Sequence, residues 1–433
     1  MSNEKSLFDL YFSYVADTEA PTIYHRWSLL SSVGAFLGRQ AYLAQGLVKI
    51  YPNMYVMLIG NPGTRKSSAI KTAKRVLKGA GYDTFSAERT TKEKFLLDLE
   101  GISDEQQHFM ERGGKRAKGD TGIHDILDNL NLSGGSGEHD GVPREVFITA
   151  DEFNEFAGTG NIDFLSTLGA LWDWDDELDC YRQRFKNSKS ISIYQPTISI
   201  LGGNTHSSFQ LAFPSAALGQ GFLSRLILVH SEPSGRKITF PKKPDEAIAV
   251  AMMEKFNAIK KTVKGEIPLD SGAKQAVDAI YRTWQDLEDY RLKSYSTRRL
   301  THMLKLCLIC AAMRCSAVIT QEDVILANTI LTYTENSMSK ALSEFGNSRH
   351  ATASHAIMTA LYESKKAIPF EDLWKVVQRD LEKRENLQDL LRNLSEAEKI
   401  NFDKAAGGFL PKQKPVNSRA LYVNLNLLKE YKE

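Results

Sequence analysis

The feature that most limits what this chain can fold into is the segment GNPGTRKSS, residues 60–68. An apolar run from Met54 to Ile59 precedes it and is typical of a buried strand, and a helical pattern from about Ser67 to Lys78 follows it. A glycine-rich turn between a strand and a helix presents backbone N–H groups that bind anions such as phosphate. The segment therefore predicts a phosphate-binding loop within an α/β fold.

Each residue type in this loop has an expected role. Lys66 is expected to place its charge between the β- and γ-phosphates of ATP, and Ser67 to give its hydroxyl to Mg²⁺. Arg65 stands where glycine is usual, at a position whose positive φ arginine does not adopt cheaply. The alternative is a glycine-rich turn with a chance Lys-Ser pair. The residues predicted to bind the nucleotide are Gly60, Asn61, Pro62, Gly63, Thr64, Arg65, Lys66, Ser67 and Ser68.

A second strand pattern, REVFITADE, ends in the two carboxylates Asp151 and Glu152. An ATPase with a phosphate-binding loop needs an acidic group in the Mg²⁺ shell and a base that polarises the attacking water. We therefore assign Asp151 to the metal, together with Ser67, and Glu152 to the water. The alternative is a solvated strand end.

Two later strands and the lid supply three further kinds of candidate. The strand TISILGG leads into Asn204, which is expected to orient the water near the γ-phosphate, unless Asn204 and Thr205 only form an Asx-turn or helix cap. Arg225 comes just before the strand LILVHS and is predicted to face the next subunit's nucleotide as an arginine finger. Its alternative is a surface arginine or a strand-end salt bridge. Arg298 or Arg299 is a candidate to reach the γ-phosphate within the same subunit, or the two form a surface pair.

The order of elements divides the chain into four regions. Strands alternate with helices around the loop, which favours a parallel sheet covered on both faces. We expect an N-terminal helical region at 1–50, a P-loop ATPase core at 51–240, a helical lid at 241–348 and a winged-helix domain at 349–433. Polar, glycine-rich residues at about 101–143 indicate an insertion. A second core strand is expected at 82–87, and lid helices at 245–261, 271–295, 301–315 and 320–345.

Composition limits the class of protein. Lys and Arg number 55 and Asp and Glu 53, so the net charge is +2, and a nucleic-acid partner is neither implied nor excluded. Cys307, Cys310 and Cys315 share one apolar run. A zinc site would need a second pair of ligands at a suitable spacing, and none is evident in the sequence, so we expect these cysteines to pack in the core. The polar N-terminus and the lack of an apolar run of about 20 residues predict a cytoplasmic protein without a membrane span.

Cations mixed with aromatic residues mark the segment YRQRFKNSKS, residues 181–190, as the candidate DNA-binding site. Such a mixture suits a single-stranded backbone and its stacked bases. The alternative is an exposed hairpin that balances the neighbouring acidic run. The cations of this segment are Arg182, Arg184, Lys186 and Lys189. Weaker candidates are Arg112, Lys115, Arg116 and Lys118 in the insertion, and the basic stretch from Lys399 to Arg419.

In this order the motifs resemble those of the AAA+ ATPases, and within them the MCM-type helicases. The MCM arginine finger lies in a Leu-Ser-Arg-Phe-Asp stretch, and the matching residues here, Leu223 to Ile227, lack Phe-Asp. The stretches from Pro52 to Ser67 and from Ile198 to Lys237 are more closely similar to phage and mobile-element P-loop proteins regarded as replicative helicases. That resemblance covers roughly residues 20–240. In that set, arginine before the P-loop lysine is not unusual.

The resemblance implies ATP hydrolysis coupled to DNA unwinding or translocation. The leading hypothesis is an oligomeric ring, expected as a hexamer, that binds Mg-ATP at subunit borders and single-stranded DNA in its pore. One alternative is an AAA+ helicase loader or protein-remodelling ATPase, with little DNA-stimulated turnover. Another is an ATP-switched initiator whose winged helix binds an origin. The sheet order stays open between an AAA+ and a RecA-like core.

Overall fold

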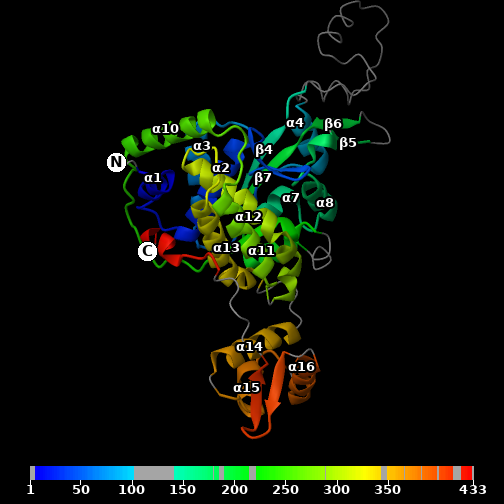
Figure 1. Ribbon diagram of the computed structural model, residues 1–433. Helices are drawn as coiled ribbons and strands as arrows, with labels where there is room; N and C mark the ends of the chain where they lie inside the picture. The colour runs from blue at the N-terminus through cyan, green and yellow to red at the C-terminus, as the bar shows by residue number, and fades with distance from the viewer. Residues whose placement is uncertain are drawn as a thin grey trace, which may run out of the picture.

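The computed structural model describes residues 5–101, 141–178, 180–184, 190–213, 221–287, 289–342, 349–364, 366–381, 383–396, 399–412 and 421–431. The main sheet has four parallel strands in the order β4-β7-β3-β8. Figure 1 labels two of them, β4 and β7. The strands are β3 (Tyr55–Ile59), β4 (Glu145–Ala150), β7 (Thr197–Asn204) and β8 (Leu226–His230). The predicted α/β fold with a parallel sheet is confirmed.

The strand register decides which residues meet at each edge of this sheet. Ile59 pairs with Asn204 on one side and with His230 on the other, and Ala150 pairs with Gly202. Because the strands are parallel, their carboxyl ends share one edge, which we call the carboxyl edge. The opposite edge is the amino edge. β7 lies between the strand that leads into the loop and the strand that ends before Asp151.

Helices cover both faces of the sheet, so β3 is buried at all of its positions, which explains its unbroken apolar run. Adjacent glycines of β7 identify the two faces. A Cβ atom on Gly203 would lie 3.3 Å from Ile70 of α3 (Lys66–Gly79), and one on Gly202 would lie 3.2 Å from Phe153 of α7 (Phe153–Ala157). α2 (Thr22–Leu37) packs with α3, and α9 (His206–Ala212) packs with α7.

Two expectations about the first half of the chain are wrong. Residues 41–50 are not helical but form a hairpin of β1 (Ala41–Gln45) and β2 (Val48–Ile50), and β1 also pairs with β9 (Gly265–Glu266). Gly46 supplies the positive φ of the hairpin turn, at +62°. Residues 82–87 contribute one bridge, Phe85 to Phe147, instead of a strand.

The lid region also differs from its expected helix limits. The expected helix 271–295 is interrupted at Trp284, which has an extended backbone. The centre of the Trp284 ring lies 3.8 Å from the Arg299 guanidinium carbon. α13 begins with the predicted capping box between Thr320 and Asp323, and it packs along β8. The helices are α10 (Glu246–Thr262), α11 (Ser271–Thr283), α12 (Lys293–Met313) and α13 (Gln321–Ala341). Their apolar side chains share one hydrophobic cluster with the sheet.

The C-terminal unit has its own hydrophobic cluster. Its helices α14 (Arg349–Glu363), α15 (Phe370–Val377) and α16 (Arg384–Glu396) precede a hairpin of β10 (Ile400–Asp403) and β11 (Gly408–Pro411). This is the element order predicted for the region. The other elements are α1 (Leu7–Tyr14), α4 (Lys92–Glu100), α8 (Ile162–Ala170), the hairpin of β5 (Cys180–Gln183) and β6 (Ile191–Tyr194), and short 3-10 helices at Asp176–Leu178, Leu223–Arg225, Tyr290–Leu292 and Leu425–Tyr431.

Candidate active site

Residues 60–65 form the turn between β3 and α3. Gly60 is required sterically, because a Cβ atom there would lie 2.5 Å from the Tyr24 hydroxyl and 2.8 Å from the Ser231 carbonyl oxygen. Gly63 has a φ of +86° and Arg65 a φ of +62°. Arg65 therefore adopts the left-handed conformation that glycine normally supplies, at a cost of about 1–2 kcal/mol. The loop combines the expected backbone with a strained residue immediately before α3.

Lys66 points its ammonium group into this loop. Its Nζ donates to the carbonyl oxygens of Gly60 at 2.8 Å and Asn61 at 3.1 Å, and to Thr64 Oγ1 at 3.2 Å. The residue is only 6% exposed. Burial lowers the pKa of Lys66, and the negative charge of Glu152 opposes this effect. Lys66 and Glu152 both follow the carboxyl ends of strands of the parallel sheet, so they lie at the same edge.

The amino terminus of α3 is open to an anion. Arg65 is the N-cap residue of α3, and its side chain makes no capping hydrogen bond. The first N–H groups of a helix have no acceptor within the helix, and they carry partial positive charge. Asn61 and Gly63 are exposed, and Ser67 is partly exposed, so solvent reaches this end of the helix. An anionic group is the ligand that these N–H groups favour.

The two predicted acids follow β4 but have different surroundings. Asp151 Oδ2 lies 2.7 Å from Lys71 Nζ, and both side chains are partly exposed. Glu152 Oε2 is buried and has no hydrogen-bond partner among the described residues. Burial raises the pKa of Glu152, while Lys66 and a hydrogen bond from Ser208 lower it. Glu152 thus presents a buried, unpartnered carboxylate oxygen at the carboxyl edge.

Asn204 lies between the loop and the two acids, because its strand, β7, lies between β3, which leads into the loop, and β4, which ends before Asp151. It is fully buried, its backbone oxygen accepts from the Gly60 N–H at 3.4 Å, and its Oδ1 has no partner among the described residues. The role of helix cap belongs to Thr205, whose Oγ1 accepts from the Ser208 N–H at 3.0 Å. The Asn204 amide nitrogen donates to Met57 Sδ at 3.7 Å, so Oδ1 is the atom of this side chain that stays without a partner in the described part of the chain.

Sequence analysis missed several residues of this edge. The Tyr24 hydroxyl donates to the Ile59 carbonyl oxygen at 2.8 Å and braces the start of the loop. The rings of His206 and His230 lie 5.4 Å apart, and His230 pairs with Ile59 at the end of β3. Tyr24 and His230 come from elements far apart in the sequence, and no local pattern marks them. His206 is detectable only because it follows Asn204 closely in the chain.

Arg225 lies at the amino edge of the sheet, away from the loop of its own chain. It ends a short 3-10 helix directly before β8, and β8 begins with Leu226 beside Tyr55. The loop follows Ile59, at the other end of β3. A strand of this length spans about 16 Å at roughly 3.3 Å per residue. If Arg225 acts on a nucleotide, that nucleotide belongs to another copy of the chain.

A cationic cluster surrounds Arg225. Its guanidinium lies 5.9 Å from the centre of the Trp172 ring, and that of Arg298 lies 5.5 Å from the same ring. Burial lowers the pKa of Arg225, and the charge of Arg298 adds to this effect. Asp173 lies 4.0 Å from Arg298 Nη1 but 2.9 Å from the buried Lys305 Nζ. Asp173 is thus the carboxylate that neighbours three cations, Arg225, Arg298 and Lys305. The positive charge of this cluster favours an anionic partner.

The two lid arginines have different places. Arg299 is 2% exposed, its Nε lies 2.7 Å from Glu335 Oε1, and its Nη2 donates to Asn328 Oδ1 at 2.8 Å. Arg299 is therefore part of the packing between α12 and α13. Arg298 belongs to the cluster at the amino edge. The expectation that one of them reaches the γ-phosphate of its own subunit does not fit these positions.

The candidate DNA-binding segment is described only in part. Arg182 and Arg184 are exposed, and Arg182 lies on β5 of the antiparallel β5–β6 hairpin directly before β7. The ring of Tyr181 packs 5.7 Å from that of Trp174. Lys186 and Lys189 lie outside the described residues, as do the insertion cations Arg112, Lys115, Arg116 and Lys118. Of the basic C-terminal stretch, the exposed lysines described are Lys399, Lys404 and Lys412.

No protein-family model matches this sequence, and no curated protein is significantly similar to it. Within the described ranges, every helix is too short or too polar to span a lipid bilayer. Cys307 and Cys310 are buried in the main hydrophobic cluster, as predicted. In the same part of the chain, no three His, Cys, Asp or Glu side chains gather in a way that could hold a metal ion by themselves.

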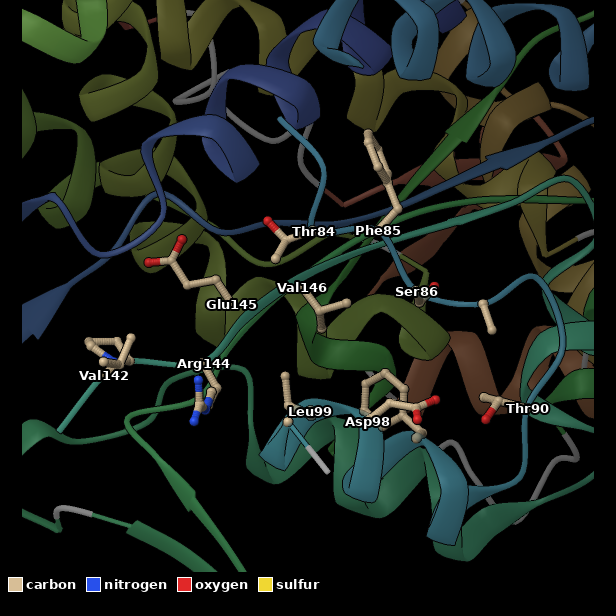
Figure 2. A pocket seen from close by; sticks show the side chains of 14 residues that line it. Thr84, Phe85, Ser86, Thr90, Asp98, Leu99, Val142, Arg144, Glu145 and Val146 are labelled. Carbon is tan, nitrogen blue, oxygen red and sulfur yellow. The ribbon is translucent and has the colours of Figure 1, made fainter. Parts of the chain in front are cut away.

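A cavity of about 480 Å³ lies at the β4 side of the sheet, between α4 and the bridge at Phe85 (Figure 2). Phe95, Leu99 and Val146 contribute apolar lining, and Arg144 and Asp98 contribute charged groups. None of the predicted site residues that the structure describes lines this cavity. The candidate active site is therefore the loop at the carboxyl edge of the sheet and not this cavity.

Proposed function

We propose that this chain is an ATPase of the AAA+ type whose active site is completed by a second copy. We propose that ATP hydrolysis drives DNA unwinding or translocation during the replication of a phage or mobile element. One observation carries the proposal: Lys66, Glu152 and Asn204 gather at the carboxyl edge, whereas Arg225 lies at the amino edge. An assembly in which the amino edge of one protomer faces the loop of the next unites the two sets. A hexameric ring is the assembly we expect.

The residues at the loop suit Mg-ATP. Lys66 and the open N–H groups of α3 would hold phosphate oxygens, and Ser67 and Asp151 would bind Mg²⁺. Mg²⁺ typically binds one or two protein oxygens together with waters and phosphates, so no all-protein cage is needed. When bound, it would supply charge neutralisation on the phosphates. Lys66 would exchange its contacts with the loop carbonyls for phosphate oxygens, and Asp151 would exchange Lys71 for the metal.

Hydrolysis assigns separate tasks to Glu152, Asn204 and Arg225. Glu152 Oε2 would accept a proton from the attacking water, and its raised pKa makes it a stronger proton acceptor than an exposed glutamate. Asn204 Oδ1 would accept a hydrogen bond from the remaining O–H of this water and so orient the nucleophile. Arg225 of the neighbouring protomer would stabilise the negative charge that develops on the transferred phosphoryl group.

The test of this function is the ATPase rate with and without single-stranded DNA, alongside unwinding of a forked duplex. We expect single-stranded DNA to stimulate turnover and the fork to open only with ATP. Replacing both Arg182 and Arg184 with alanine should reduce the stimulation, because a cationic hairpin is the proposed DNA contact. ATP turnover that ignores DNA would contradict the helicase and favour a loader. Strong preference for one duplex sequence would favour an initiator.

Mixing experiments test whether the site is shared. Subunits carrying Arg225→Ala, added to wild-type protein at a fixed total concentration, should depress ATPase activity more than in proportion to their share. Each altered subunit would disable a nucleotide site on its neighbour and disturb the assembly around it. Arg282→Ala is the matched control, because Arg282 is exposed and pairs with Asp278 within its own helix. A linear decline with the Arg225→Ala fraction would contradict the coupling of turnover between neighbouring subunits, and an unchanged rate at every fraction would contradict a shared site.

A further inference from the structure

A contact joins the nucleotide loop to a turn near the amino terminus. Glu19 lies between α1 and α2, and its Oε2 accepts from Arg65 Nε at 2.8 Å and lies 2.6 Å from Arg65 Nη2. The other oxygen, Oε1, accepts from the Ile238 N–H at 2.8 Å. The carboxylate is therefore held from two sides, and one of these sides is the strained residue of the loop.

The turn that carries Glu19 is itself fixed by the segment that follows β8. The Ser234 hydroxyl donates to the Glu19 carbonyl oxygen at 2.7 Å, and Arg236 Nη2 donates to the Ala16 carbonyl oxygen at 2.7 Å. The Lys242 N–H donates to the Asp17 carboxylate. We call residues 15–21 together with 231–243 the clasp. The clasp gives Glu19 a defined position from which to hold Arg65.

Arg65 needs such a support. A non-glycine residue in the left-handed region is strained, and it persists only where its surroundings determine its conformation. Exposed ion pairs usually contribute little, because two mobile side chains must be ordered. Here the Glu19 side chain is only 23% exposed, and the Ile238 N–H already holds its carboxylate. Two nitrogen atoms of the Arg65 guanidinium contact the same carboxylate oxygen, Glu19 Oε2. The loss of side-chain entropy on forming this ion pair therefore comes mainly from Arg65.

We propose that Glu19 is a positioning residue for the nucleotide loop: by holding Arg65, it fixes the backbone that presents Lys66 and the first N–H groups of α3 to phosphate. This inference rests on the proposed function, because it takes a nucleotide as the ligand of the loop. A loop with glycine at position 65 would need no such support. The arginine thus makes nucleotide binding depend on a turn that lies far from the loop in sequence.

The test measures the affinity of the full-length chain for a non-hydrolysable ATP analogue with Mg²⁺, in four proteins: wild type, Glu19→Gln, Arg65→Gly and the double variant. Glu19→Gln should weaken binding about five- to ten-fold, because the strained loop loses its support. Arg65→Gly should bind at least as tightly as wild type. In the Arg65→Gly background, Glu19→Gln should have no further effect, and a merely structural role of Glu19 does not predict this rescue.

The matched control is Asp17→Asn. Asparagine keeps an oxygen that can accept from the Lys242 N–H, so the turn stays fixed, while the carboxylate that is lost does not contact Arg65. This variant should leave the affinity unchanged. Wild-type affinity of Glu19→Gln, or an equal loss in both backgrounds, would overturn the proposal. If Glu19→Gln does not fold, Arg65→Lys, which loses the paired N–H contact, should show the weakened binding instead, and unchanged binding would overturn the proposal. Failure of the wild type to bind the analogue would refute the nucleotide site itself.

Discussion

Replacing Lys66 with alanine is expected to lower the rate of ATP hydrolysis by about 100- to 1,000-fold, as is typical when a buried charge that stabilises a transition state is removed. The ammonium of Lys66 is buried inside the loop, and its acceptors there are neutral oxygens. Phosphate oxygens would be stronger partners, because both groups of the pair would then be charged. Steady-state turnover and binding of a fluorescent ATP analogue measure the effect.

Lys78→Ala provides the control for the Lys66 variant. Lys78 lies in the last turn of the same helix, is exposed, and is far from the loop. It should hydrolyse ATP at the wild-type rate, and both variants should keep the wild-type unfolding temperature within a few degrees. ATP turnover retained by Lys66→Ala would remove the assignment of residues 60–68 as a phosphate-binding loop.

Replacing Glu152 with glutamine is expected to separate binding from hydrolysis. Glutamine keeps the shape of the side chain but cannot accept a proton, so turnover should fall by about 100-fold or more. Affinity for the analogue should stay equal or rise, because a negative charge near the phosphates is lost. Single-turnover hydrolysis and equilibrium binding measure the two quantities separately, and size-exclusion chromatography with ATP shows whether the variant accumulates as an assembled ring.

Glu155→Gln is the comparison for Glu152. Glu155 lies in the first turn of α7, three residues further on, and is exposed. It should behave as wild type in binding and turnover. Wild-type hydrolysis by Glu152→Gln would show that another group accepts the proton, and the unpartnered Asn204 Oδ1 would then need a different explanation.

Local sequence patterns predicted those features that depend on a few neighbouring residues. The buried run before Gly60, the acidic end of β4 and the capping box at Thr320 each appear within a few residues of sequence, and each forms as expected. The hairpin at 41–50 was missed because a short amphipathic segment is ambiguous between helix and strand until it finds a partner. The break before α12 was missed because it has no local signal, and the contact found there, between Trp284 after α11 and Arg299 of α12, joins residues that are distant in sequence.

The sequence by itself determined the kind of loop, the residues at its helix end and the carboxylates that accompany it. These depend on backbone conformation and residue type within single segments. Only the tertiary structure decided that β7 separates the loop from the acids, that Arg225 and Arg298 lie at the edge away from the loop, and that Glu19 holds Arg65. Strand order and long-range ion pairs arise from how a whole core packs, and no single segment encodes them.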